Sequence, residues 1–280
     1  MSTLTISTNH DAARRGEYAL ATGAAAVRRL FVLHNIYAPN GRRLLTRAGL
    51  KTGMHVADFG CGVGAVTRML AEIVGPQGSV TGIDVNAPQL DQASAICRNA
   101  GLANVNFFNA DACNTGLPRQ SFDLVYCRFL LLHLPDPMAC LREMRDVLKP
   151  NGILVVEDGD LASAASLPPT ALDAFADLFT RLGPTRGLDY SLAKNLYHMV
   201  KSVGFASPAI EIHQPASCGG DHGTLLTWSV QEAGAAFVSA GLISAEQLKR
   251  TLLEMEDAAS DSDVLALAPR MSTVWARKPA

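Results

Sequence analysis

Short apolar runs alternate with amphipathic stretches between residues 55 and 157. The apolar runs have the length of β-strands and lie at 55–59, 79–84, 105–108, 123–127 and 153–157. The stretches predicted as helices lie at 65–74, 88–99 and 138–148. Glycine and proline mark element ends, as in Gly75-Pro76 and Pro150-Asn151-Gly152. Strand-helix repeats joined by short turns predict an α/β fold with a parallel sheet and helices on both faces.

The segments on either side of this repeat are mostly helical. On the amino-terminal side, a helix predicted at 17–33 is followed by the break Pro39-Asn40-Gly41 and by a second helix at 42–48. Past Gly159 the predicted elements are helices at 171–182 and 191–203, and strands at 209–212 and 271–276 that enclose a helical insertion. We expect the amino-terminal helices and this insertion to form one lid that excludes water and becomes ordered when ligand binds. The predicted division is an N-terminal helical lid segment (1–48), a core (49–160) and a C-terminal part of the core with the inserted lid (161–280).

A glycine-rich loop follows the first strand and opens the next helix. It reads Asp58-Phe59-Gly60-Cys61-Gly62-Val63-Gly64, and its glycines permit a tight turn and close approach of a ligand to the backbone. Asp84 lies at the end of the second strand, where a carboxylate can accept both ribose hydroxyls of a nucleoside. The same loop also satisfies the dinucleotide fingerprint through Gly60-x-Gly62-x-x-Ala65, so an NAD-dependent oxidoreductase is a competing interpretation.

Four further features separate the two interpretations. Asp58 would repel a pyrophosphate but can hold the ammonium group of a methionine moiety. Asp111 follows the third strand, where it can accept a hydrogen bond from an adenine amino group. The other two are Phe122-Asp123-Leu124-Val125 at the start of the fourth strand and Leu148-Lys149-Pro150-Asn151-Gly152 at the start of the fifth.

This ordered set resembles the class I S-adenosylmethionine-dependent methyltransferases over roughly residues 50–160. The run Leu131-Leu132-His133-Leu134-Pro135-Asp136-Pro137 is similar to that of ubiquinone/menaquinone-type and natural-product methyltransferases, and Val274-Trp275-Ala276-Arg277-Lys278-Pro279 looks like the family's last strand. The resemblance implies a Rossmann-like, doubly wound, seven-stranded sheet of order 3-2-1-4-5-7-6, with the last strand antiparallel. It also implies S-adenosyl-L-methionine as the cofactor of the 49–160 core.

The resemblance carries cofactor roles onto matching positions. Gly60, Cys61 and Gly62 would lie against the methionine and ribose, and Asp84 would bind the ribose. Val85 and Asn86 would lie beside the adenine, and Asp111 and Ala112 would lie at its edge. Backbone groups of Cys127 or Arg128 would contact the methionine tail. Tyr18 would close over the cofactor.

Two residues are candidates for catalysis. Methyl transfer is an in-line displacement in which alignment supplies much of the acceleration, and a base is needed only if the acceptor must lose a proton. His133 follows the fourth strand and is either that base or a packed structural histidine. Glu157 ends the fifth strand, where it would orient the substrate or pair with Arg128. No metal site is expected, because the fourth strand ends in Cys127-Arg128 rather than in carboxylates.

Composition narrows the class of protein. Hydrophobic residues make up 48% and charged residues 18% of 280 residues, which favours a compact globular fold. The net charge of −2, without a basic run, argues against nucleic-acid binding. The apolar stretch 123–134 is too short to span a bilayer and Arg128 interrupts it, so no membrane insertion is expected. None of the six cysteines forms a C-x-x-C pair, and no signal peptide is recognised, which together favour a cytoplasmic protein; a homodimer is also expected.

Three functions follow, in this order of preference. The first is an S-adenosylmethionine-dependent methyltransferase that methylates O, N or C of a small aromatic or apolar acceptor. The second is a cofactor-binding protein of the same fold that catalyses a non-methylating reaction such as a rearrangement. The third is the NAD-dependent oxidoreductase.

Overall fold

The computed structural model of the protein describes residues 24–280, so the predicted cofactor contact of Tyr18 lies outside the described residues. Within that part, seven strands form one sheet in the order β3-β2-β1-β4-β5-β10-β7. Their bounds are β1 (His55–Phe59), β2 (Ser79–Asp84), β3 (Val105–Asn109), β4 (Phe122–Arg128), β5 (Leu148–Asp160), β7 (Ala209–His213) and β10 (Arg270–Arg277). The five neighbouring strands β3, β2, β1, β4 and β5 pair in parallel, whereas β10 runs antiparallel to β5 and β7. The predicted order 3-2-1-4-5-7-6 with an antiparallel last strand is confirmed.

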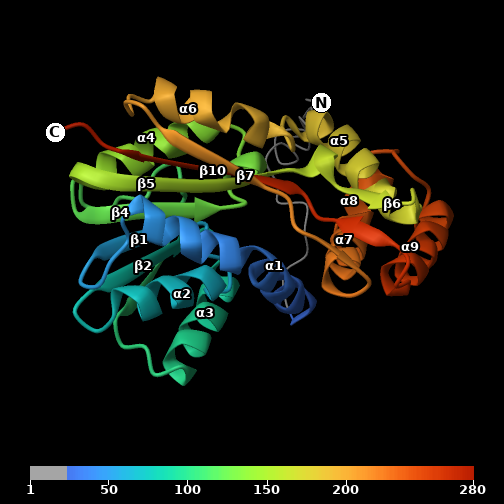
Figure 1. Cartoon of the computed structure of the whole chain (residues 1–280), viewed down its shortest axis with the longest axis horizontal. Helices are drawn as coiled ribbons and strands as arrows, with labels where there is room; N and C mark the ends of the chain where they lie inside the picture. The colour runs from blue at the N-terminus through green and yellow to red at the C-terminus, as the bar shows by residue number, and fades with distance from the viewer. Residues whose placement is uncertain (1–23) are drawn as a thin grey trace, which may run out of the picture.

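Helices cover both faces of this sheet (Figure 1). One face carries α1 (Ala24–Ala48), α2 (Ala65–Val74) and α3 (Ala87–Asn99), and the other carries α4 (Pro137–Val147) and α6 (Leu196–Ser202). Successive strand residues point to opposite faces. Val56 therefore packs in the apolar cluster under α1 and α2, while its neighbour Ala57 packs in the cluster under α4. The doubly wound α/β architecture expected from the sequence is confirmed.

The amino-terminal segment is one helix rather than two. Pro39 lies inside α1, so the predicted break at Pro39-Asn40-Gly41 is wrong. Proline removes one backbone hydrogen bond from a helix interior, which is locally unfavourable. The half of α1 that follows Pro39 packs against the sheet, where Leu44 and Leu45 are fully buried. Burial of these side chains outweighs the local cost of the proline.

A second group of elements, here called the cap, lies beyond the carboxyl end of β5 (Figure 1). Its helices are α5 (Ala174–Arg186), α7 (Asp221–Glu232), α8 (Gly234–Ser239) and α9 (Ala245–Ser260). In the described part of the chain they accompany a small sheet of order β6-β9-β8, formed by β6 (Ala165–Leu167), β9 (Leu265–Leu267) and β8 (Ala216–Cys218). The helical character of the insertion was expected, but this small sheet was not. Short 3₁₀ turns complete the chain: η1 (Leu131–His133), η2 (Leu161–Ser163), η3 (Ala171–Asp173) and η4 (Leu192–Asn195).

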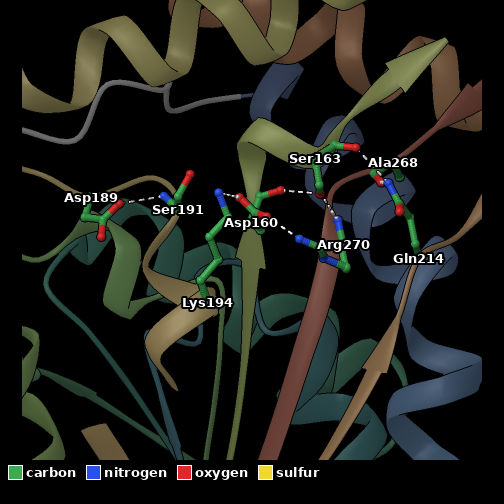
Figure 2. Close-up of polar contacts among 8 residues, drawn as sticks. All are labelled: Asp160, Ser163, Asp189, Ser191, Lys194, Gln214, Ala268 and Arg270. Carbon is green, nitrogen blue, oxygen red and sulfur yellow. Dashed lines mark hydrogen bonds and ion pairs between the residues drawn. The ribbon is translucent and has the colours of Figure 1, made fainter. Parts of the chain in front are cut away.

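Three strands of the large sheet connect to the cap at one polar junction (Figure 2). Arg270, the first residue of β10, donates from Nη2 to Oδ2 of the buried Asp160 at 2.8 Å and from its backbone N–H to Oγ of Ser163 at 2.7 Å. Gln214, next to β7, donates from Nε2 to the carbonyls of Ser163 at 2.8 Å and Ala268 at 3.1 Å. These contacts fix the ends of β5, β7 and β10 relative to one another at the point where the chain passes from the sheet to the cap.

Among residues 24–280, no helix combines the length and the apolar character needed to cross a membrane.

Candidate functional site

The glycine loop adopts backbone conformations that are sterically unfavourable for residues with a Cβ atom. Gly60, Gly62 and Gly64 have φ angles of 68°, 54° and 77°, in the left-handed region that glycine adopts without steric cost. A Cβ atom on Gly60 would lie 2.8 Å from Cδ1 of Leu130, and one on Gly64 would lie 2.8 Å from Cβ of Ala93. Glycine is therefore required at both positions, and it leaves the loop backbone open toward a ligand.

Asp84 organises this loop from the end of β2. Its Oδ2 accepts a hydrogen bond from the N–H of Gly62 at 2.8 Å, and its Oδ1 accepts one from the N–H of Asn86 at 2.9 Å. Burial raises the pKa of Asp84, and these backbone donors act in the opposite direction. Asn109 supports the same turn by donating to the carbonyls of Asp84 and Val85. The carboxylate thus holds a fixed position at the edge of the loop.

A cavity of about 290 Å³ runs from this loop to the cap. The predicted cofactor residues that line it are Gly60, Cys61, Gly62, Asp84, Val85, Asn86 and Arg128. The predicted catalytic residue His133 also lines it. Its far end is apolar and is formed by α1, η1, η2 and the cap, with lining residues that include Leu33, Leu132, Leu161, Phe175, Phe179 and Leu225. One cavity therefore joins a nucleoside-type loop to an apolar chamber.

Arg128 enters the cavity from the end of β4. Its Nη2 donates to Nδ1 of His34 in α1 at 3.0 Å, while its buried Nη1 has no hydrogen-bond partner within residues 24–280. Burial and the neighbouring Arg128 charge lower the pKa of His34 to about 4, so this imidazole is neutral and can accept the bond. Cys127, the alternative candidate, is fully buried in the core and does not line the cavity.

Three other predicted cofactor residues lie outside the cavity lining. Asp58 is buried beneath the loop, where its Oδ2 accepts a hydrogen bond from the Thr67 hydroxyl at 2.6 Å. Burial raises its pKa to about 7. Asp111 is exposed and its Oδ1 accepts from the N–H of Cys113, while Ala112 packs against the core.

Glu157 lies within the sheet rather than in the cavity. It is the register partner of Arg128 on the neighbouring strand, yet the predicted pairing of these two side chains is not formed in the described structure. Glu157 accepts hydrogen bonds from the hydroxyls of Tyr126 and Thr273 instead, and Arg128 reaches His34. Two hydroxyl donors on adjacent strands satisfy the buried carboxylate, so an ion pair is not required.

His133 faces the cavity from η1, a turn that Asp158 holds in place. The Oδ2 of Asp158 accepts hydrogen bonds from the N–H groups of Leu131 at 2.8 Å and Leu132 at 3.3 Å. The ring of His133 packs edge-on against Tyr190, with centroids 5.8 Å apart. Burial and the positive charge of Arg29 lower the pKa of His133 to about 3. The imidazole is therefore neutral and presents a weakly basic ring.

Sequence reasoning missed several residues of the site. Asp158 was not predicted, because its role in holding η1 depends on a turn that no motif encodes. Arg29, Ser229 and the cap residues Phe175 and Phe179 line the cavity through packing between distant segments. No group of three His, Cys, Asp or Glu residues within 24–280 is arranged to hold a metal ion.

Comparison with known proteins assigns the fold and loop to a family. A family model described as a methyltransferase domain matches residues 50–204, more than half of the 280-residue chain. The chain belongs to this family. The predicted resemblance to S-adenosylmethionine-dependent methyltransferases is thereby confirmed.

Two curated relatives are similar in sequence. Over 116 residues the chain is 38% identical to aklanonic acid methyltransferase of Streptomyces sp. (strain C5), covering 41% of this chain and 53% of that protein. Over 170 residues it is 31% identical to demethylmenaquinone methyltransferase of Staphylococcus aureus (strain JH9), covering 61% of this chain and 68% of that protein. The alignment thus spans about half of the first relative and two thirds of the second.

The fold also occurs in solved methyltransferases. Phosphoethanolamine N-methyltransferase 2 of Haemonchus contortus, in complex with phosphomonomethylethanolamine and S-adenosylhomocysteine, matches with a TM-score of 0.58 and 18% identity. The match covers 89% of this chain and 57% of that chain, and at this identity it shows the fold alone.

S-adenosylmethionine is the cofactor of this family, and the site fits it. The backbone at Gly60 and Gly62 is open to a ligand, Asp84 presents a carboxylate at the cavity wall, and Arg128 has a buried donor without a partner in residues 24–280.

Proposed function

We propose that the protein transfers the methyl group of S-adenosylmethionine to an O, N or C atom of a small, ring-containing, largely apolar acceptor. The observation that supports this proposal is the single cavity, which has the glycine loop and Asp84 at one end and Phe175, Phe179 and Leu225 at the other. Aromatic and aliphatic walls favour an acceptor with a large apolar surface, because burying that surface supplies the binding free energy.

Binding of the cofactor is assigned to residues that surround its end of the cavity. Asp84 would accept hydrogen bonds from the ribose hydroxyls while its backbone contacts hold the loop. We assign the donation to the methionine carboxylate to Nη1 of Arg128, which has no partner among residues 24–280 and belongs to a side chain that lines the cavity. Asp58 acts from beneath, by supporting the first turn of α2 through Thr67.

Catalysis in this site depends on alignment more than on proton transfer. When bound, the cofactor supplies an activated methyl group whose leaving group is a neutral thioether, so the chain must mainly orient the acceptor and exclude water. His133 is assigned to orientation, because a ring with a pKa of about 3 accepts a hydrogen bond but takes up a proton weakly. Asp158 acts indirectly, by fixing η1 beneath His133.

The α1 helix and the cap together close the chamber. Arg29 and Leu33 of α1 and Leu225 of α7 line the same cavity, so both segments must stay in place for the acceptor to be surrounded. We assign them a lid function. The relatives are named for aklanonic acid and demethylmenaquinone, and an acceptor of comparable ring-containing character is consistent with this chamber.

The test is an acceptor panel incubated with methyl-labelled S-adenosylmethionine. The panel contains phenols, quinols, ring ketones, amines and keto acids, and label is followed into each acceptor. We expect label in ring-containing acceptors and reduced transfer by the Phe179→Ala variant, with Phe31→Ala as the control outside this cavity. Label only in small charged acceptors, or conversion of an acceptor without label, would overturn the proposal.

A further inference from the structure

Arg29 is a buried charged residue at the wall of the cavity. It lies in α1 and is 3% exposed. Its Nε donates to Oε2 of Glu232 at 2.8 Å, and Glu232 is the last residue of α7 in the cap. The side chains of the two residues are 4% and 7% exposed, so the ion pair is buried. A buried pair of this kind carries no net charge.

One donor of this guanidinium has no partner in the part of the chain that the structure describes. The Nη2 atom of Arg29 is buried and makes no hydrogen bond to any residue in 24–280. Buried polar groups in folded proteins are almost always hydrogen-bonded, and leaving a charged donor unsatisfied is costly. Because Arg29 also lines the cavity, an oxygen atom of a bound ligand can supply the missing acceptor.

The position of Arg29 points to the acceptor rather than to the cofactor. Its partner Glu232 lies on α7, the same helix that contributes Leu225 and Ser229 to the chamber. The charge of Arg29 also acts on His133, which places the guanidinium near the ring that faces the acceptor. The glycine loop and Asp84 belong to the other end of the cavity.

The charges around Arg29 indicate which kind of ligand oxygen can accept its free hydrogen bond. Glu232 already neutralises Arg29, and the surrounding lining is mostly apolar, with Ser229 and the neutral His133 ring as polar but uncharged neighbours. A carboxylate entering this end would leave an uncompensated negative charge next to Glu232, at a large desolvation cost. A carbonyl oxygen would satisfy the donor without adding charge.

We propose that the preferred acceptor is an uncharged ring compound whose carbonyl oxygen accepts a hydrogen bond from Arg29, and that Glu232 enforces this preference by cancelling the guanidinium charge. This inference rests on the proposed function, since it concerns the acceptor end of the same cavity. Arg29 is thus a binding residue, and Glu232 a specificity-determining residue that acts through it.

The test compares three ring probes of similar shape on protein loaded with S-adenosylhomocysteine. They are 2-acetonaphthone, which has a carbonyl, 2-isopropylnaphthalene, which has none, and 2-naphthoate, which is anionic. The wild-type protein should bind 2-acetonaphthone roughly tenfold or more tightly than either of the others, the range expected for a hydrogen bond to a charged group. Calorimetry measures the three dissociation constants.

The variant Glu232→Gln sharpens the test. Glutamine can still accept from Nε of Arg29 but no longer cancels its charge, so 2-naphthoate should become the tighter ligand by roughly tenfold. The matched control is Glu254→Gln, at an exposed glutamate of α9 in the same cap, which should leave the wild-type ranking unchanged. The wild-type ranking stands as a test even where a variant fails to fold.

Separate outcomes overturn the inference and the proposed function. Equal binding of 2-acetonaphthone and 2-isopropylnaphthalene by wild type, or an unchanged ranking in folded Glu232→Gln, would overturn the inference. So would a loss of S-adenosylhomocysteine affinity in that variant with the probe ranking preserved, because Arg29 would then serve the cofactor. Failure to label any ring acceptor, with the probe ranking as expected, would instead overturn the proposed methyl transfer.

Discussion

The carboxylate of Asp84 both holds the glycine loop through hydrogen bonds and lines the cavity. Substitution of Asp84 by alanine removes hydrogen bonds to the loop and the proposed hydrogen bonds to the ribose. We expect Asp84→Ala to weaken cofactor binding by about 1.5–3 kcal/mol, the range for hydrogen bonds to charged groups. The fold should persist, because the side chain is only partly buried and lies at a ligand cavity.

Titration calorimetry with S-adenosylhomocysteine measures this change. Asp91→Ala serves as the control, because Asp91 is exposed on the neighbouring α3 helix. An unchanged dissociation constant in folded Asp84→Ala would remove the ribose assignment.

Asp58 makes stability depend on pH in a defined direction. Burial raises its pKa from 3.8 to about 7, so between these values the folded protein keeps a proton that the unfolded chain releases. The resulting stabilisation is complete below pH 3.8 and is lost as the pH rises through about 7. Asp58→Asn cannot release a proton, and its amide oxygen still accepts from Thr67.

The unfolding free energy of wild type should therefore fall relative to that of Asp58→Asn as the pH rises across this interval. Urea denaturation at several pH values measures the difference, which removes the contributions of other titrating groups. Asp91→Asn is the control at an exposed site. Parallel pH profiles for wild type and Asp58→Asn would contradict the buried, protonated carboxyl.

At single positions, the sequence predicted what a local motif encodes. Gly60, Gly62 and Asp84 were identified because their roles depend on a strand, a turn and a helix that are contiguous in the chain. Arg29 and Asp158 were not, because each owes its role to a partner brought close only by folding. Glu157 shows the opposite error: it was expected to orient the substrate or pair with Arg128, but the hydroxyls of Tyr126 and Thr273 on the two neighbouring strands satisfy it.

At the scale of elements, periodicity located the regular parts of the sheet accurately. The bounds of β1, α2 and β2 agree with the predicted ranges, because glycine and proline mark the ends of these segments. Strands β6, β8 and β9 have three residues each, too few to show an alternating pattern, and they were not predicted. The continuity of α1 through Pro39 depends on its contact with the sheet, which local propensity does not contain.

The junction around Asp160 links the large sheet to the cap. Among residues 24–280, removing the guanidinium of Arg270 leaves this buried carboxylate with one longer charged contact, to Lys194 at 3.4 Å. We expect Arg270→Gln to destabilise the protein by about 1–2 kcal/mol, since Asp160 is buried although Arg270 is half-exposed. Urea denaturation at neutral pH measures the loss.

Arg68→Gln is the matched control for this junction. It breaks the pair of Arg68 and Glu72, which lies on the exposed side of α2 with both side chains accessible. Such a pair contributes about 0.3–0.5 kcal/mol. Equal effects of the two substitutions would show that the junction contributes no more than a surface ion pair.

At the scale of the whole molecule, the chamber is assembled from segments far apart in the chain. The buried pair of Arg29 and Glu232 joins α1 to α7, and both helices contribute to the cavity wall. Ligand binding should therefore stabilise both helices together. We expect amide hydrogen exchange to slow at residues 24–38 and in α7 when S-adenosylhomocysteine is added.

Helix α6 is the internal control for the exchange measurement, because none of its residues lines the cavity. Its protection should change little. Identical exchange of α1 with and without ligand would contradict the lid assignment. The homodimer expected from the sequence stays a prediction, which sedimentation of the same sample would test.

The most direct test of the proposed cofactor site is titration calorimetry of the wild-type protein with S-adenosylmethionine, S-adenosylhomocysteine and NAD. We propose one nucleoside site at the glycine loop, with Asp84 for the ribose and Arg128 for the methionine carboxylate. We expect S-adenosylmethionine and S-adenosylhomocysteine each to bind with one molecule per chain, and NAD not to bind. Binding of NAD without binding of either sulfur compound would contradict the central claim.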